Sequence, residues 1–224
     1  MKFIYIVSFI IIGIVSSSEL YSKEEVLKNE EIKENSSSPR QVIESITSNI
    51  RKLIQEKPGE GSKELRGMIS SIVNKAFDFN SLSEKTIKKE FWAKLQNKQK
   101  ATFKTLFSSL LKKLYSKKTE ELIAKADLDF LKEAIKDNHA TVDYSIKRKD
   151  VDIVITYEMC KAKLSKNQDN PWKICNVKFD GADLARTYAI QFNTKLEKGI
   201  LQKVSLTKSF DSLLAQMDKK VNTI

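Results

Sequence analysis

The order in which apolar spacing changes along the chain constrains its fold most strongly. From residue 39 to about residue 118, apolar side chains recur every three or four positions, which predicts helices. Three later segments alternate polar with apolar side chains or are rich in β-branched and aromatic residues, as strands are: 141–147, 151–159 and 172–180. Helical spacing returns over residues 183–198 and 209–220. Helices, then an antiparallel meander, then helices predict an α+β domain.

The helical half divides at its caps and breaks. Ser38, Pro39 and Gln41 form a typical helix start, with a serine cap, a proline at the first position and a glutamine at the third. The expected helices follow from residue 39, over 65–76, over 81–95 and from Asn97 to about residue 118. Residues 128–136 fit a helix by local propensity, or a first strand that completes a sheet of about four strands.

The N-terminus has the pattern of a signal for export. Lys2 precedes the apolar run 3–15 and the small residues 16–18, which predicts a secretory signal peptide over residues 1–18. An uncleaved anchor is the alternative, although the run is short for a membrane span. Residues 19–38 contain six acidic residues and few apolar ones, so we interpret them as a flexible leader before a single domain over 39–224.

The net charge of the chain and its small number of histidines and cysteines limit the functions that it can have. The net charge is +11, which fits contact with anionic lipids or simply a solvated lysine-rich surface. Export and the lack of a compact basic-aromatic motif argue against nucleic acid as a partner. One histidine and two cysteines exclude a zinc ribbon, and we expect no metal site. We expect no catalytic residue either, because His139 is the only histidine and its sequence context predicts a turn or strand edge.

The two cysteines can be tested against the expected strand pairing. Placing Tyr157 opposite Val177 brings apolar residues together and sets Met159 against Cys175, while Cys160 faces the other side of the sheet. This register favours two free thiols. A β-bulge between the strands would change that expectation.

Many residues in both halves follow the pattern of a known family. In the helical half these are Phe77-Asp78-Phe79, Phe91-Trp92, Lys98-Gln99-Lys100, Phe103, Phe107, Leu110-Leu111 and Tyr115. In the second half they are Trp172-Lys173-Ile174, Val177, Gly181, Leu184, Tyr188, Gln191-Phe192 and Gly199. In this order and spacing, the chain resembles the MlaC family of periplasmic phospholipid-binding proteins, once called toluene-tolerance auxiliary proteins. The chain departs from the family at Cys175-Asn176, where the family has Tyr-Asp, and residues 200–208 look inserted.

The resemblance implies a fold and a function. The expected fold is a curved antiparallel sheet packed by helices, similar to nuclear-transport-factor and cystatin folds, with an apolar pocket between sheet and helices. The expected function is a monomeric periplasmic carrier that keeps the outer membrane asymmetric. Its cargo is phospholipid, and its partners are an outer-membrane lipoprotein complex and the MCE-domain subunit of an inner-membrane transporter. No cofactor is expected.

The candidate pocket lining consists of apolar and aromatic residues from the strands and from two helices. The strands supply Tyr144, Ile146, Ile153, Ile155, Tyr157, Met159, Val177 and Phe179, and the helices supply Phe103, Phe107, Leu110, Leu114, Tyr188 and Phe192. The same residues could fill an ordinary packed core. Two other functions remain open: a binding module for another hydrophobe, such as a sterol-like lipid or an aromatic solvent, and a degenerate enzyme of the nuclear-transport-factor-like class.

Overall fold

The computed structural model describes five stretches of the chain: residues 38–56, 63–123, 128–147, 152–162 and 171–223. The predicted signal peptide and leader lie outside them, apart from Ser38. Within these stretches, no helix combines the length and the apolar character that crossing a bilayer requires.

Five helices precede the sheet: α1 (Pro39–Glu56), α2 (Lys63–Ala76), α3 (Phe79–Lys85), α4 (Lys89–Lys94) and α5 (Asn97–Ile123). The predicted start of α1 is confirmed. The main-chain N–H of Gln41 donates to Ser38 Oγ at 3.2 Å, and the N–H of Ser38 donates to Gln41 Oε1 at 2.8 Å. This reciprocal pair satisfies two donors that a helix start leaves unpaired.

The third predicted helix, over 81–95, is instead the two short helices α3 and α4. The Asp78 carboxylate starts α3 by accepting from the N–H of Ser81 at 2.9 Å. Asn193 holds the break that follows, because its Oδ1 accepts from the N–H of Lys88 and its Nδ2 donates to the carbonyl of Thr86. A side chain more than a hundred residues away therefore ends the helix, which local spacing could not reveal.

The strands form one antiparallel meander in the order β1-β2-β3-β4-β5. They are β1 (Leu128–Lys136), β2 (His139–Ile146), β3 (Ile153–Lys161), β4 (Trp172–Phe179) and the two-residue β5 (Ala182–Asp183). The ambiguous segment 128–136 is thus a strand, paired along its length with β2. Partner pairing outweighs its helix propensity, as is common for strands.

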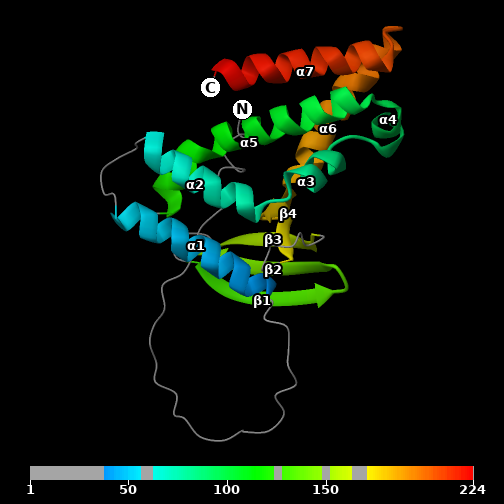
Figure 1. Cartoon of the computed structure of the whole chain (residues 1–224). Helices are drawn as coiled ribbons and strands as arrows, with labels where there is room; N and C mark the ends of the chain where they lie inside the picture. Colours follow the sequence, from blue (N-terminus) through cyan, green and yellow to red (C-terminus); the bar gives the residue numbers. More distant parts are fainter. Residues whose placement is uncertain (1–37, 57–62, 124–127, 148–151, 163–170, 224) are drawn as a thin grey trace, which may run out of the picture.

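Two long helices complete the chain: α6 (Leu184–Leu201) and α7 (Leu206–Thr223). Asp183 caps α6 by accepting from the N–H of Arg186 at 2.9 Å. Figure 1 shows the sheet at one end of the molecule with α1 across it, α5 further away, and α7 at the opposite end. The predicted α+β fold is confirmed, with both ends of the described chain helical.

The predicted register between β3 and β4 is correct at one end and wrong at the other. Tyr157 lies opposite Val177, as expected, but Met159 lies opposite Ile174 because a bulge follows Glu158. The extra residue, Cys175, lets β4 bury both Ile174 and Trp172, which are 1% and 4% exposed. A regular register would turn both side chains to the other face of the sheet.

The bulge also reverses the prediction about the cysteines. Cys160 and Cys175 form a disulfide, with their Cα atoms 5.9 Å apart, so the expectation of two free thiols is wrong. The register that matches Tyr157 with Val177 and Met159 with Cys175 leaves Ile174 on the other face of the sheet. Burial of Trp172 and Ile174, which lie beyond Cys175, determines where the bulge occurs.

We predict that this disulfide stabilises the fold without determining the register. The cysteines lie 15 residues apart, so opening the bond should lower the free energy of unfolding by about 3 kcal/mol. Urea unfolding with and without reductant, and of the Cys160→Ser/Cys175→Ser variant, measures this difference. Thiols that react with an alkylating reagent in the folded, unreduced protein would contradict the assignment.

Candidate functional site

One face of the sheet is apolar along three consecutive strands. Its largest side chains, Tyr144 on β2 and Tyr157 on β3, are 0% and 1% exposed, and their rings meet edge to face with centroids 6.1 Å apart. The other buried residues that β2, β3 and β4 place on this face are Ala140, Val142, Ile146, Ile155, Met159, Trp172, Ile174, Val177 and Phe179. We call this the inner face of the sheet, and its alternation with polar neighbours follows the pleat.

A group of aromatic rings lies among the helices. Phe103 and Phe107 of α5 stack with centroids 5.8 Å apart, and Phe192 of α6 meets both edge to face at 5.5 Å. Tyr188 contacts Phe107 at 4.9 Å, and Phe210 of α7 contacts Phe103 at 5.5 Å. These rings pack directly against one another, at the separations typical of aromatic pairs in protein interiors.

The structure brings most of the predicted lining residues into one contiguous apolar cluster. Eleven of the fourteen are buried members of it: Phe103, Phe107, Tyr144, Ile146, Ile155, Tyr157, Met159, Val177, Phe179, Tyr188 and Phe192. Ile153 is half-buried and packs against its edge. Leu110 is buried outside this cluster, and Leu114 is half-buried. That these residues line a pocket stays a prediction.

Sequence reasoning missed the contribution of α1 and α2. Both helices add buried residues to the same cluster: Val42, Ile43, Ile46, Ile50, Leu65 and Ile69. The helical spacing of these residues signalled a buried stripe, but periodicity alone does not say which surface a stripe covers. In the structure α1 contacts β2 and lies across the sheet (Figure 1).

Charged residues border the cluster where the start of α1 meets β1. The N–H of Arg40 donates to Glu133 Oε1 at 2.7 Å, and its guanidinium pairs with Glu44 at 2.6 Å. The same guanidinium lies over the ring of Phe130, 4.0 Å from the centroid. We call Arg40, Glu44, Phe130 and Glu133 the polar margin. It combines both signs of charge with an aromatic surface at the edge of an apolar interior.

The hydroxyl of Tyr144 is the unusual polar group of this region. It is buried and, among the residues that the structure describes, has no hydrogen-bond partner. Burial raises the pKa of Tyr144 well above its usual value; nearby Glu44 raises it further, and Arg40 opposes the shift. A hydroxyl buried without a partner is costly, and it can donate to an acceptor that enters the interior.

An open pocket of about 350 Å³ lies beside the disulfide, at the end of β1 and the start of β2. It is bordered by Lys85, His139 and Cys175, and of the predicted lining residues by Met159. His139 begins β2, and its Nδ1 lies 3.5 Å from Cys160 Sγ. Because both cysteines are bridged, neither offers this histidine a thiol nucleophile.

Glu158, which also borders this pocket, is engaged with polar side chains of β4. Glu158 Oε1 pairs with Lys178 at 2.7 Å, and its Oε2 accepts from Asn176 at 3.2 Å. Glu158 raises the pKa of Lys178 by accepting its hydrogen bond. Asn176 also accepts from the N–H of Ala185, which attaches the start of α6 to the sheet. Within the described stretches, no three His, Cys, Asp or Glu side chains gather as metal ligands would.

Comparison with known proteins identifies the family. A family model described as MlaC protein matches residues 40–219, which is most of the chain. The chain belongs to the MlaC family. The predicted resemblance is therefore confirmed, and the MlaC match spans both the helices and the sheet described above.

A solved structure has the same fold as this MlaC-family chain. It is the phospholipid-binding protein from Ralstonia solanacearum in complex with a phospholipid. The TM-score is 0.62 at 16% sequence identity, over 82% of this chain and 94% of that one. A comparison with curated proteins gave no match.

We predict that the Tyr144 hydroxyl lowers the free energy of unfolding of this MlaC-family protein when no lipid is bound. Tyr144→Phe removes a buried polar group without changing the ring, so it should raise the free energy of unfolding of delipidated protein by about 1 kcal/mol. Urea unfolding measures the change, and Tyr21→Phe is a control from the predicted leader. A loss of about 1 kcal/mol would mean that the hydroxyl has a protein partner.

Proposed function

We propose that the protein is a phospholipid carrier that holds acyl chains between the inner face of the sheet and the helices that cover it. The observation that carries this proposal is the combination of that wide apolar face with a buried Tyr144 hydroxyl near the polar margin, which has no hydrogen-bond partner within the described stretches. Membership of the MlaC family supports it. So does the fold shared with a protein that was solved with a phospholipid bound.

The energetics of lipid transfer explain why such an interior is needed. Exposing one CH₂ group to water costs about 0.8 kcal/mol, so a 16-carbon chain costs on the order of 12 kcal/mol. A two-chain lipid costs about twice as much, which makes unaided passage through water very slow. A carrier removes this barrier by offering surfaces about as apolar as a bilayer.

The polar margin suggests how the lipid is oriented. Acyl chains lie against Tyr157, Val177 and their neighbours on the inner face. The glycerol esters then lie near Tyr144, whose hydroxyl donates to an ester carbonyl, and the head group lies outside with Arg40 available to its phosphate. This orientation gives the buried hydroxyl a partner and leaves the charged part of the lipid in water.

The predicted export signal and the family together suggest the setting. The carrier works in the periplasm, where it exchanges phospholipid with an outer-membrane lipoprotein complex and with the MCE-domain subunit of an inner-membrane transporter. It binds and releases its cargo without chemical change. Lipid asymmetry of the outer membrane is the property that this traffic maintains.

A charge on the inner face should abolish lipid retention. Val177→Arg places a cation among apolar side chains, where an unpaired charge is strongly disfavoured. Native mass spectrometry of protein purified from a Gram-negative host should find a two-chain phospholipid on the wild type and none on this variant. Val154→Arg is the matched control, because Val154 is 36% exposed on β3 and the variant should retain its lipid.

The outcomes of this experiment separate the alternatives. Thermal unfolding checks that Val177→Arg folds, and Val177→Phe, which adds volume without charge, replaces it if it does not. Wild-type occupancy in a folded Val177 variant would place the lipid elsewhere. A different co-purified hydrophobe would identify another cargo on the same scaffold, and protein without any hydrophobe would contradict the carrier.

Removing the Tyr144 hydroxyl should weaken lipid binding while leaving the apolar surface intact. We expect Tyr144→Phe to release phospholipid about fivefold faster, which is the effect of one hydrogen bond in a protein interior. Transfer of a fluorescent phospholipid from the loaded protein to acceptor vesicles measures this rate. An unchanged rate would show that the hydroxyl does not contact the cargo.

A further inference from the structure

The turn between α6 and α7 exposes a compact group of aliphatic side chains. Leu201 is 83% exposed, Ile200 is 41% exposed and Val204 is 38% exposed. Single exposed apolar residues are normal on a protein surface, but here three lie within five positions of one turn. We call Ile200, Leu201 and Val204 the α6–α7 tip.

Exposed lysines lie on both sides of this tip. They are Lys195, Lys198, Lys203 and Lys208. The one acidic residue between positions 195 and 208 is Glu197, which is paired with Lys88 of the loop before α4. The flanks of the tip therefore carry an excess of positive charge.

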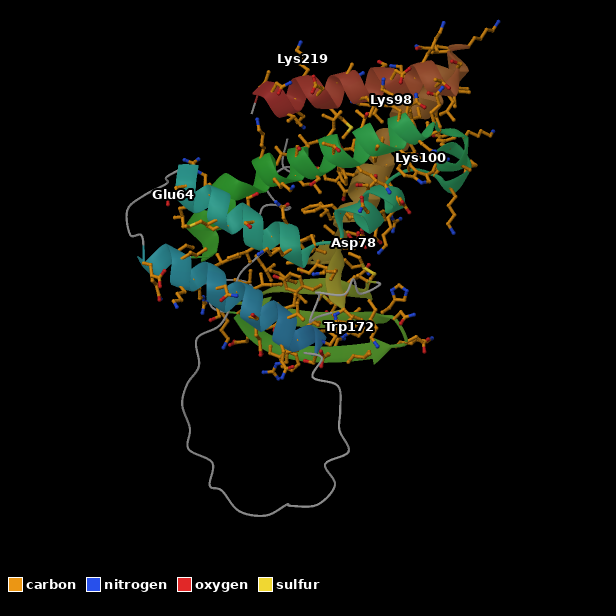
Figure 2. The ribbon with its side chains drawn as sticks, in the orientation of Figure 1. Glu64, Asp78, Lys98, Lys100, Trp172 and Lys219 are labelled. Atoms are coloured by element: carbon orange, nitrogen blue, oxygen red, sulfur yellow. A yellow bond between two sulfur atoms is a disulfide. The ribbon has the colours of Figure 1, made fainter. Side chains whose placement is uncertain are left out.

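The start of α5 lies next to the same region. Gln99 Nε2 donates to the carbonyl of Thr207 at 3.3 Å and to Asp211 Oδ1 at 2.7 Å, so the first turns of α5 and α7 are joined. Lys98, beside Gln99, is exposed (Figure 2). The basic surface around the tip thus extends from α6 and α7 to α5.

Main-chain hydrogen bonds hold the turn in one shape. The N–H of Lys203 donates to the carbonyl of Ile200 at 2.9 Å, and the N–H of Val204 donates to that of Gly199 at 3.0 Å. Gly199 also lets α7 approach, because a Cβ there would collide with the Ser209 side chain. The apolar side chains are therefore presented on a fixed support.

Lys203 occupies a backbone position that favours glycine. Its φ is 61°, in the left-handed region, where a side chain costs about 1 kcal/mol relative to glycine. A lysine at this position lowers stability and adds an exposed cation two positions from Leu201. Lys203→Gly removes the charge and also the backbone strain. Any loss of membrane binding in this variant therefore comes from the lost charge and not from a less stable fold.

The composition of the tip favours one kind of partner. Protein interfaces are enriched in aromatic residues and arginine and depleted in lysine, whereas this tip has aliphatic side chains surrounded by lysines. Aliphatic residues that enter the head-group layer, with lysines that contact lipid phosphates, are the pattern of membrane-surface binding. A nucleic acid would need no exposed leucine.

We propose that the α6–α7 tip docks the protein on bilayer surfaces that carry anionic phospholipid. Ile200 and Leu201 enter the head-group region, while Lys198, Lys203 and Lys208 contact the phosphates. Figure 1 shows this turn at the end of the molecule opposite the sheet, so it is separate from the polar margin. Docking and cargo retention can therefore be measured independently.

Vesicle flotation of the full mature chain tests the proposal. The probes are vesicles of phosphatidylcholine alone and of phosphatidylcholine with about one-third phosphatidylglycerol. Wild type should bind the anionic vesicles more tightly and lose binding as salt rises. Leu201→Ser should weaken this binding about tenfold, and Lys203→Gly about fivefold with equal or greater thermal stability.

Two matched controls remove similar groups away from the tip. Ile190→Ser removes an aliphatic side chain that is 60% exposed on the same helix, and Lys219→Gln removes a lysine toward the other end of α7 (Figure 2). Both should bind anionic vesicles as the wild type does. All four variants should retain phospholipid in native mass spectrometry, so a failure of docking is distinct from a failure of the carrier function.

Two results would overturn the proposal. If the wild type binds the two kinds of vesicle equally, or binds neither, anionic lipid has no role in docking. Equal effects of tip and control substitutions would show that any binding is spread over the whole basic surface.

Discussion

The inner face of the sheet is a wide apolar surface, and covering it is the requirement on which the arrangement of the helices depends. Tyr144, Tyr157 and Val177 lie on neighbouring strands and point to the same side. Because such side chains are stable only away from water, α1 and α2 contribute their own apolar stripes to the same cluster. The proposed lipid interior is this covered surface, so in this proposal the fold and the cargo site share the same residues.

The pairing of β4 with β3 was predicted correctly from the sequence at one end and incorrectly at the other. Alternation along β3 and β4 correctly paired Tyr157 with Val177. The prediction failed beyond Glu158, because burial of Trp172 and Ile174 requires an extra residue in β4. That requirement comes from the segments packed on the strand, such as the junction between α2 and α3, where Phe77 bridges to Ile174, and a strand pattern does not contain it. The disulfide is a consequence of the same bulge.

The candidate site was predictable in composition but not in arrangement. Periodicity and the family resemblance placed Phe103, Phe107 and Phe192 in the interior, and the structure packs these rings together. The polar margin was missed, because Arg40 and Glu133 are 93 positions apart and meet only when α1 lies on β1. Tyr144 was predicted for its ring, whereas the state of its hydroxyl, which finds no partner in the part of the chain that the structure describes, is a property of the folded interior.

The position of the acyl chain tests the central claim most directly. Crystals of the protein loaded with a phospholipid that carries bromine on its acyl chains would locate the bromine by anomalous scattering. We predict bromine between the inner face and the helices, in contact with Tyr157 or Val177. Bromine in the open pocket beside His139, or on the surface of α6 and α7, would contradict the account.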